Sequence, residues 1–124
     1  MGITTVYGNA TMDNATQNAL YLKQKVGMKA QVAKGADKPL VKAPVGATVI
    51  VHGEAGFGDV KAPSLLNVSA IDTPASRYII ESVRAAPGEI TLVAVGPLTN
   101  LALALEEDPE IVNLVKEVVV MGGA

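Results

Sequence analysis

The chain has 124 residues, enough for one domain with a modest core. Its residues are 49% hydrophobic but only 3% aromatic, so the core must consist of Val, Ile, Leu and Ala, which suits buried parallel strands. The net charge of −2 argues against nucleic acid or an anionic membrane as a partner, and the lack of cysteine excludes disulfides, thiolate catalysis and zinc-thiolate sites. No apolar run reaches the length of a membrane span, and a cytoplasmic location fits the cysteine-free composition.

The first part of the chain has the pattern of a β-α-β unit. Residues 3–7 are rich in β-branched side chains and predict a strand. Apolar residues three or four apart predict a helix over residues 12–26, closed by a glycine at position 27. Residues 29–34 predict a second strand, and this order favours parallel pairing with a right-handed crossover. The residues predicted to face the core from the helix are Ala15, Ala19, Leu22 and Val26.

Residues 36–73 are rich in proline and glycine and show the least regular pattern, which in a compact domain is often functional. Residues 49–51 predict a short extended piece. His52, the only histidine, opens the loop His-Gly-Glu-Ala-Gly-Phe-Gly-Asp, which can close over a ligand. Its imidazole can stack on a base or help to protonate a leaving group, and a structural role for a lone histidine stays open. The Gly56-Phe-Gly58 pair suggests a nucleotide-binding Rossmann-type module, but the third glycine and the following helix are missing.

The second part of the chain continues the alternation. A helix is predicted after Thr73, with Pro74 as its first residue, and residues 90–95 predict a strand buried on both faces. A helix that begins at Pro97, a short helix after Asp108, and a buried strand over residues 118–120 complete the pattern. The residues predicted to face the core are Ala75, Tyr78, Ile79 and Val83 in the first of these helices and Leu98, Leu101, Ala102 and Leu105 in the second.

Three predicted strands end in polar or glycine-rich turns that contain Asn9, Thr99 and Met121. Ligands of an open parallel sheet bind outside the carboxyl ends of the strands, so we expect the three residues to face one crevice. Asn9 is either a turn residue or a ligand for sugar hydroxyls. Thr99 either bonds within its helix start or offers a backbone carbonyl to a hard cation, and Met121 either packs in the core or lines a wall beside a flat ring. The expected fold is a single α/β domain over residues 1–124 with an open, mostly parallel Rossmann-like sheet and flanking helices.

Four stretches carry a family resemblance, with fitting order and spacing: GITTVYGN (residues 2–9), HGEAGFGD (52–59), ITLVAVGPLTN (90–100) and VVVMGGA (118–124). Through them the chain resembles the inosine–uridine-preferring nucleoside hydrolase family over essentially its whole length. The resemblance implies hydrolysis of the N-glycosidic bond of ribonucleosides to ribose and a free base. It also implies a calcium ion that holds a water and the ribose hydroxyls, with an aspartate as the general base and an oxocarbenium-like transition state.

The resemblance also implies roles for individual residues. Asn9 matches the asparagine that contacts the ribose, His52 the histidine near the leaving base, and Met121 the methionine that lines the ribose pocket. Thr99 matches the threonine whose backbone carbonyl ligates calcium. The family's aspartate cluster, with the metal carboxylates and the general base, is expected before Met1, and further substrate-binding residues are expected after Ala124.

We therefore expect the chain to be a portion of a nucleoside hydrolase whose sheet is incomplete relative to the family. We also expect it to contain no catalytic residue of its own and to be inactive in isolation. Its substrate would be a ribonucleoside and its assembly a homo-oligomer. The main alternative is a non-catalytic α/β fragment that self-associates through unpaired strand edges. A nucleotide-binding Rossmann-type module is the other alternative.

Overall fold

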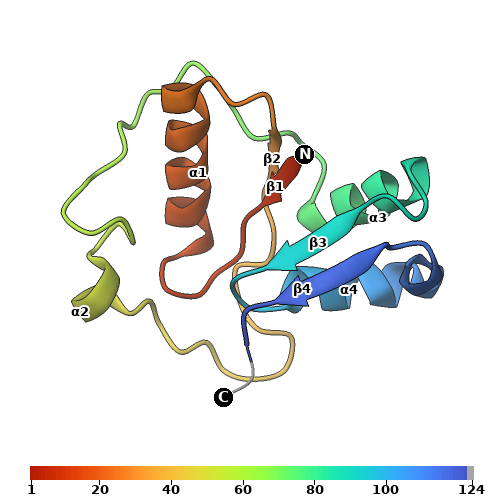
Figure 1. The fold of residues 1–124 in the computed structure, drawn as a ribbon. Coiled ribbons are helices and arrows are strands. Elements are labelled where there is room, and N and C mark those ends of the chain that lie inside the picture. The colour runs from red at the N-terminus through yellow and green to blue at the C-terminus, as the bar shows by residue number, and fades with distance from the viewer. Residues whose placement is uncertain (123–124) are drawn as a thin grey trace.

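The computed structural model describes residues 1–122, in which helices and short strands alternate along the chain (Figure 1). The predicted α/β class, with parallel strands and flanking helices, is confirmed. The strands are β1 (Gly2–Thr4), β2 (Gln31–Ala33), β3 (Thr91–Ala94) and β4 (Glu117–Val120). The helices are α1 (Met12–Val26), α2 (Val49–His52), α3 (Ala75–Ala85), α4 (Thr99–Glu107) and the 3₁₀ helix η1 (Pro109–Asn113).

Within residues 1–122 the strands form two separate parallel pairs instead of the single open sheet that was predicted. Ile3 aligns with Val32 in the β1–β2 pair, and Leu92 aligns with Val118 in the β3–β4 pair. β1 and β3 share no ladder of backbone hydrogen bonds. The two pairs are instead connected by side chains near the carboxyl ends of β1 and β3, which is where the candidate site lies.

Helix α1 has the bounds that the sequence predicts because both of its ends are capped locally. The Asn14 N–H donates to Thr11 Oγ1 at 3.2 Å, and Gly27 adopts the left-handed conformation (φ 66°) that a C-terminal cap requires. The predicted inward face is wrong at its C-terminal end, where Leu22 and Val26 are exposed. The helix instead buries Thr16, Asn18 and Leu20, because its N-terminal half also holds a loop through polar side chains.

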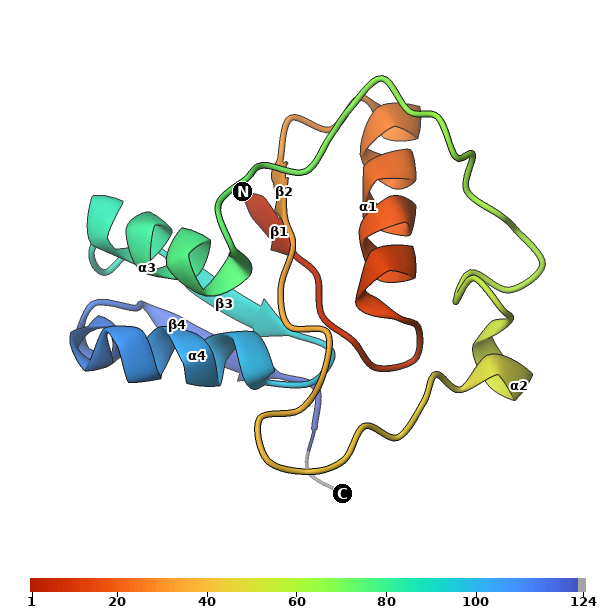
Figure 2. The same cartoon turned by 180° about the vertical axis from the view of Figure 1, so that it is seen from behind.

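The main hydrophobic core lies between α3, α4, η1 and one face of the β3–β4 pair. Figures 1 and 2 show α3 and α4 together on that face, with nothing on the opposite face among the described residues. Leu98 and Leu105, predicted to point inward from α4, are 45% and 43% exposed, because the helix presents Ala104 and its first polar residues to the interior instead. The buried members of the core are Ile79, Ile80, Val83, Ala104 and Ile111.

The prediction that β3 and β4 are buried on both faces is wrong for residues 1–122. Val93 is 66% exposed, Val119 is 49% exposed, and every residue of β4 is classed as exposed. Both covering helices lie on the same side of the pair, which leaves Val93 and Val119 uncovered, and even on the helix side Val118 and Val120 are 45% and 47% exposed. An uncovered valine face remains, formed by Val93, Val95, Val119 and Met121.

The long connection between β2 and α3 is irregular, as predicted, with one exception. The piece predicted as extended forms the one-turn helix α2, in which the His52 N–H donates to Thr48 O at 3.0 Å. Pro74 occupies the cap position of α3 and not its first turn. Residues 123 and 124, at the end of the predicted glycine turn, lie outside the described residues, and no described helix is long and apolar enough to cross a membrane.

Candidate functional site

The turns that follow β1 and β3 lie against each other at the carboxyl ends of these strands. The Tyr7 hydroxyl is 3.1 Å from Thr99 Oγ1, a hydrogen bond between residues 92 positions apart. Gly8 packs so closely on Pro97 that a Cβ at position 8 would lie 3.2 Å from Pro97 Cδ. A Cβ there would be a tighter contact than usual, so glycine suits the close approach of the two turns, although β1 and β3 are not paired.

Asn100 connects three segments at this point, and the sequence analysis gave it no role. Its side chain is buried at the start of α4, beside Thr99. Asn100 Nδ2 donates to Thr5 O at 2.9 Å, and Asn100 Oδ1 accepts from the Ala36 N–H at 2.8 Å. The end of β1, the segment after β2 and the start of α4 are thus joined by one amide. Its position directly after Thr99 in the GPLTN stretch was the available signal.

The side chains of Asn9 and Met121 are both open to solvent. Asn9 lies in the turn after β1 and is exposed. Met121 follows β4, is 69% exposed, and donates its N–H to Ala94 O at 2.8 Å, which extends the β3–β4 ladder by one bond. The turn of Met121 is therefore adjacent to the end of β3. Asn9 directly follows Gly8, which packs on Pro97.

The loop that His52 opens is fixed on the N-terminal half of α1. Asn18 Nδ2 donates to Ala55 O at 2.8 Å, and Asn14 Nδ2 donates to Glu54 O at 3.1 Å. A Cβ on Gly56 would overlap that of Ala10, so the loop touches the residue next to Asn9. His52 itself is half-buried. Neither asparagine was predicted as a site residue, although their spacing of four puts them on one face of the helix.

The described residues do not by themselves fit a calcium ion. Residues 1–122 contain no group of three or more His, Cys, Asp or Glu side chains that could hold a metal. Calcium takes six to eight oxygen ligands, and the Thr99 backbone carbonyl would supply one. No chemical step can be assigned to a metal on these residues alone.

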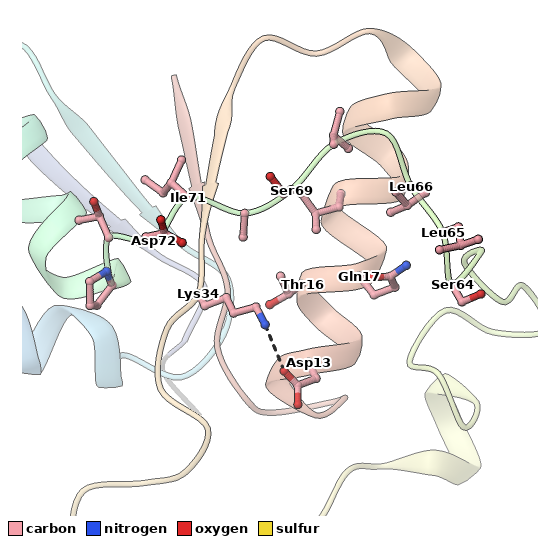
Figure 3. Close-up of a pocket in the computed structure, with 15 residues that line it drawn as sticks. Asp13, Thr16, Gln17, Lys34, Ser64, Leu65, Leu66, Ser69, Ile71 and Asp72 are labelled. Atoms are coloured by element: carbon pink, nitrogen blue, oxygen red, sulfur yellow. Dashed lines mark ion pairs between the residues drawn. The ribbon is translucent and has the colours of Figure 1, made fainter.

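A separate cavity of about 720 Å³ lies between α1 and the segment of residues 64–74 (Figure 3). At one end Lys34 Nζ is 3.7 Å from Asp13 Oδ1, and both side chains are largely exposed. Gln17 donates to Pro63 O and holds the segment on the helix. Asn9, His52, Thr99 and Met121 are not among its lining residues, so the cavity is distinct from the cluster of strand-end turns.

The chain is similar to nucleoside hydrolases both in sequence and in fold. Residues 1–124 match the family model described as inosine-uridine preferring nucleoside hydrolase. A probable uridine nucleosidase of Oryza sativa subsp. japonica is 40% identical, with 100% of this chain and 38% of the relative aligned. A pyrimidine-specific ribonucleoside hydrolase of Escherichia coli is 42% identical, with 100% of this chain and 39% of the relative aligned.

A solved structure of a ribonucleoside hydrolase has a similar fold. The purine-preferring ribonucleoside hydrolase from Gardnerella vaginalis superposes with a TM-score of 0.92 at 35% identity. The superposition covers 99% of this chain and 40% of that protein. The chain thus spans about two fifths of the length of the relatives that it matches.

Proposed function

Because the chain belongs to the inosine-uridine preferring nucleoside hydrolase family, we propose that the full protein that carries it hydrolyses the N-glycosidic bond of ribonucleosides to ribose and a free base. The family match over residues 1–124 carries this proposal. The relatives' names include uridine, pyrimidine-specific and purine-preferring enzymes, so the proposal extends to ribonucleosides as a class and not to one base.

In this proposal the residues of the chain bind and orient the nucleoside. The exposed amide of Asn9 hydrogen-bonds ribose hydroxyls, and the exposed thioether of Met121 forms an apolar wall of the ribose pocket. His52 hydrogen-bonds the departing base, which leaves more readily when it is protonated or hydrogen-bonded. The contacts of its loop with Asn14 and Asn18 support this role, because they hold the loop beside the turn of Asn9.

Calcium, the general base, the homo-oligomeric assembly and a cytoplasmic location also belong to the proposal. The Thr99 carbonyl would be one calcium ligand, and the other oxygens and the base would come from residues other than 1–122, among which no metal-binding group of acidic or histidine side chains is found. We accordingly expect the 124-residue chain alone to be inactive and to bind calcium weakly. Tight stoichiometric calcium binding to it in calorimetry would contradict this corollary.

The test is release of ribose by the full protein, followed with a reducing-sugar assay on inosine, uridine and further nucleosides. Asn9→Ala should lower kcat/KM at least about tenfold, because one to two hydrogen bonds to the sugar are lost. Asn113→Ala is the matched control, since Asn113 is an exposed asparagine in η1 outside the cluster of strand-end turns. The proposal fails if the full protein releases ribose from no purine or pyrimidine nucleoside.

A second candidate function is supported by the uncovered valine face. A non-catalytic α/β fragment with Val93, Val119 and Met121 on an open sheet face would bury them by self-association. The nucleotide-binding alternative lacks such support. Gly56 and Gly58 follow the one-turn helix α2, and Gly56 packs on Ala10, whereas a dinucleotide loop joins a strand to a helix.

A further inference from the structure

The pairing of β1 with the chain beyond β2 is interrupted by one residue, and the Asn100 amide fills the interruption. The Thr5 N–H donates to Ala33 O at 3.0 Å, and the next N–H of that edge, from Tyr7, donates to Ala36 O at 3.0 Å. A regular parallel ladder advances by two residues on both strands, so Gly35 would be the expected partner of Tyr7. In such a ladder the Thr5 carbonyl would accept from the Gly35 N–H, and that bond is not formed. The Thr5 carbonyl and the Ala36 N–H therefore have no backbone partner among the described residues.

The Asn100 amide satisfies both the Thr5 carbonyl and the Ala36 N–H. Its NH₂ donates to Thr5 O at 2.9 Å and its carbonyl oxygen accepts from the Ala36 N–H at 2.8 Å, as a peptide unit of a third strand would do. The side chain is 4% exposed, so water cannot easily replace it. One amide of α4 therefore determines how the ends of β1 and β2 are spaced.

Gly35 provides an independent observation of the same arrangement. A Cβ at this position would overlap the Thr5 carbonyl oxygen and both polar atoms of the Asn100 amide. Gly35 does not have a positive φ, so the position requires glycine for space and not for backbone conformation. The space that a side chain would occupy is taken by Asn100.

We propose that Asn100 is a positioning residue that holds the ribose-binding turn of Asn9 at a fixed distance from the turn of Thr99. The Tyr7–Thr99 hydrogen bond is a second connection between the same two turns. Asn100 acts through the backbone of Thr5 and Ala36, and it does not touch the substrate. This inference deepens the proposed function and rests on it for its kinetic consequences.

Three variants of the full protein test the role. Asn100→Ala removes both hydrogen bonds. Asn100→Asp keeps an acceptor for the Ala36 N–H but sets a carboxylate oxygen against the Thr5 carbonyl. Gly35→Ala disturbs the same contacts without changing Asn100. Asn113→Ala is the control that should match the unmodified protein in every measurement.

The first measurement is hydrogen exchange followed by mass spectrometry, which needs no activity. Exchange at Ala36 should accelerate at least about tenfold in Asn100→Ala and Gly35→Ala but not in Asn100→Asp, which retains the acceptor. Peptides from the α3 core should stay protected in all of them. Unchanged exchange at Ala36 in Asn100→Ala would overturn the proposal.

The second measurement is steady-state kinetics on the best nucleoside substrate. All three variants should lose about 10- to 100-fold in kcat/KM, which is the loss expected when a binding group is displaced by about 1 Å. The loss for Asn100→Asp would show that the hydrogen bond donated to Thr5 O is needed. Faster exchange at Ala36 with unchanged kcat/KM would make the contact purely structural and overturn the positioning role alone. An unmodified protein that hydrolyses no nucleoside would overturn the proposed function and the positioning role together.

Discussion

Asparagine side chains, more than charged ones, hold the irregular segments of this chain in place. Asn14, Asn18 and Asn100 each donate from the amide nitrogen to a backbone carbonyl of a distant segment. An amide can donate and accept at once without the desolvation penalty of a buried charge, which suits it to backbone groups that no ladder pairs. Such contacts leave no periodic pattern in the sequence, so they could not be predicted from it.

The two asparagines under the His52 loop should differ in importance because they differ in burial. Asn18→Ala leaves the part-buried Ala55 carbonyl without its donor and should destabilise the loop by about 1–2 kcal/mol, whereas Asn14→Ala, which removes an exposed hydrogen bond, should have an effect below about 1 kcal/mol. Limited proteolysis of the full protein within residues 52–59 measures this as a faster cleavage rate. Equal cleavage rates in the two variants would contradict the ranking.

We expect the ion pair of Arg84 and Asp108 to make the free energy of unfolding fall at acid pH. Arg84 donates from Nη2 to Asp108 Oδ1 at 2.8 Å and from Nε to Oδ2. These hydrogen bonds, together with the positive charge, lower the pKa of the Asp108 carboxyl below its ordinary value, and burial opposes the shift. Because the pKa is lower in the folded state, the stabilisation is fully present above the unfolded pKa of about 4 and is lost as pH falls through the folded value.

Asp108→Asn tests this dependence. The unmodified protein should lose stability more steeply than the variant as pH is lowered from about 5 to 2, because only the unmodified protein must protonate a paired carboxylate in that window. Urea midpoints at several pH values measure the difference. Carboxylates other than Glu110, which also pairs with Arg84, contribute equally to both proteins, so parallel pH profiles would show that the pair of Arg84 and Asp108 has no such effect.

At the scale of elements, the parts that local chemistry determines were predictable from the sequence. Gly27 closes α1 as expected, and the structure adds Thr11 as the cap at its start. Its buried face was not predictable, because Thr16 and Asn18 are buried by partners that lie far away in the sequence. The one-turn helix α2 is too short for a periodic signal and was predicted as extended.

The N-terminal cap of α1 gives a prediction at this scale. Thr11→Ala removes the acceptor for the Asn14 N–H and should lower the free energy of unfolding by about 1 kcal/mol. Thr11→Ser keeps the hydroxyl and should stay within about 0.5 kcal/mol of the unmodified protein. Both values come from urea denaturation of the full protein. A Ser variant as destabilised as the Ala variant would show that the threonine methyl group, and not the cap, matters.

At the scale of the whole molecule, the sequence predicted the fold class and the parallel pairs but not the division into two pairs. Unpaired edges and uncovered faces depend on what lies beside a strand, and the apolar runs of β3 and β4 indicate only that these strands can be buried. The same limit applies to the site. Asn9, Thr99 and Met121 were singled out by their places after predicted strands and His52 by its loop, with roles implied by the family resemblance. Asn100 became visible only when the turns of three strands were seen together.

The uncovered valine face predicts how the 124-residue chain behaves on its own. Val93 and Val119 lie on a sheet face with no covering helix among residues 1–122, and contiguous exposed apolar surface drives association. Size-exclusion chromatography with light scattering should therefore give a mass above that of the 12.7 kDa monomer. Val93→Lys and Val119→Lys should shift the chain toward the monomer, because a lysine cannot be buried in the contact without a partner.

Val41→Lys is the matched control, since Val41 is 95% exposed in the loop after β2 and is not part of the valine face. It should leave the mass distribution unchanged. A monomeric unmodified chain would contradict association altogether, and dissociation by all three variants equally would attribute it to net charge. If only the two valine-face variants dissociate the chain, the valine face is the surface through which the 124-residue chain associates. A full nucleoside hydrolase would then need other residues to cover this face.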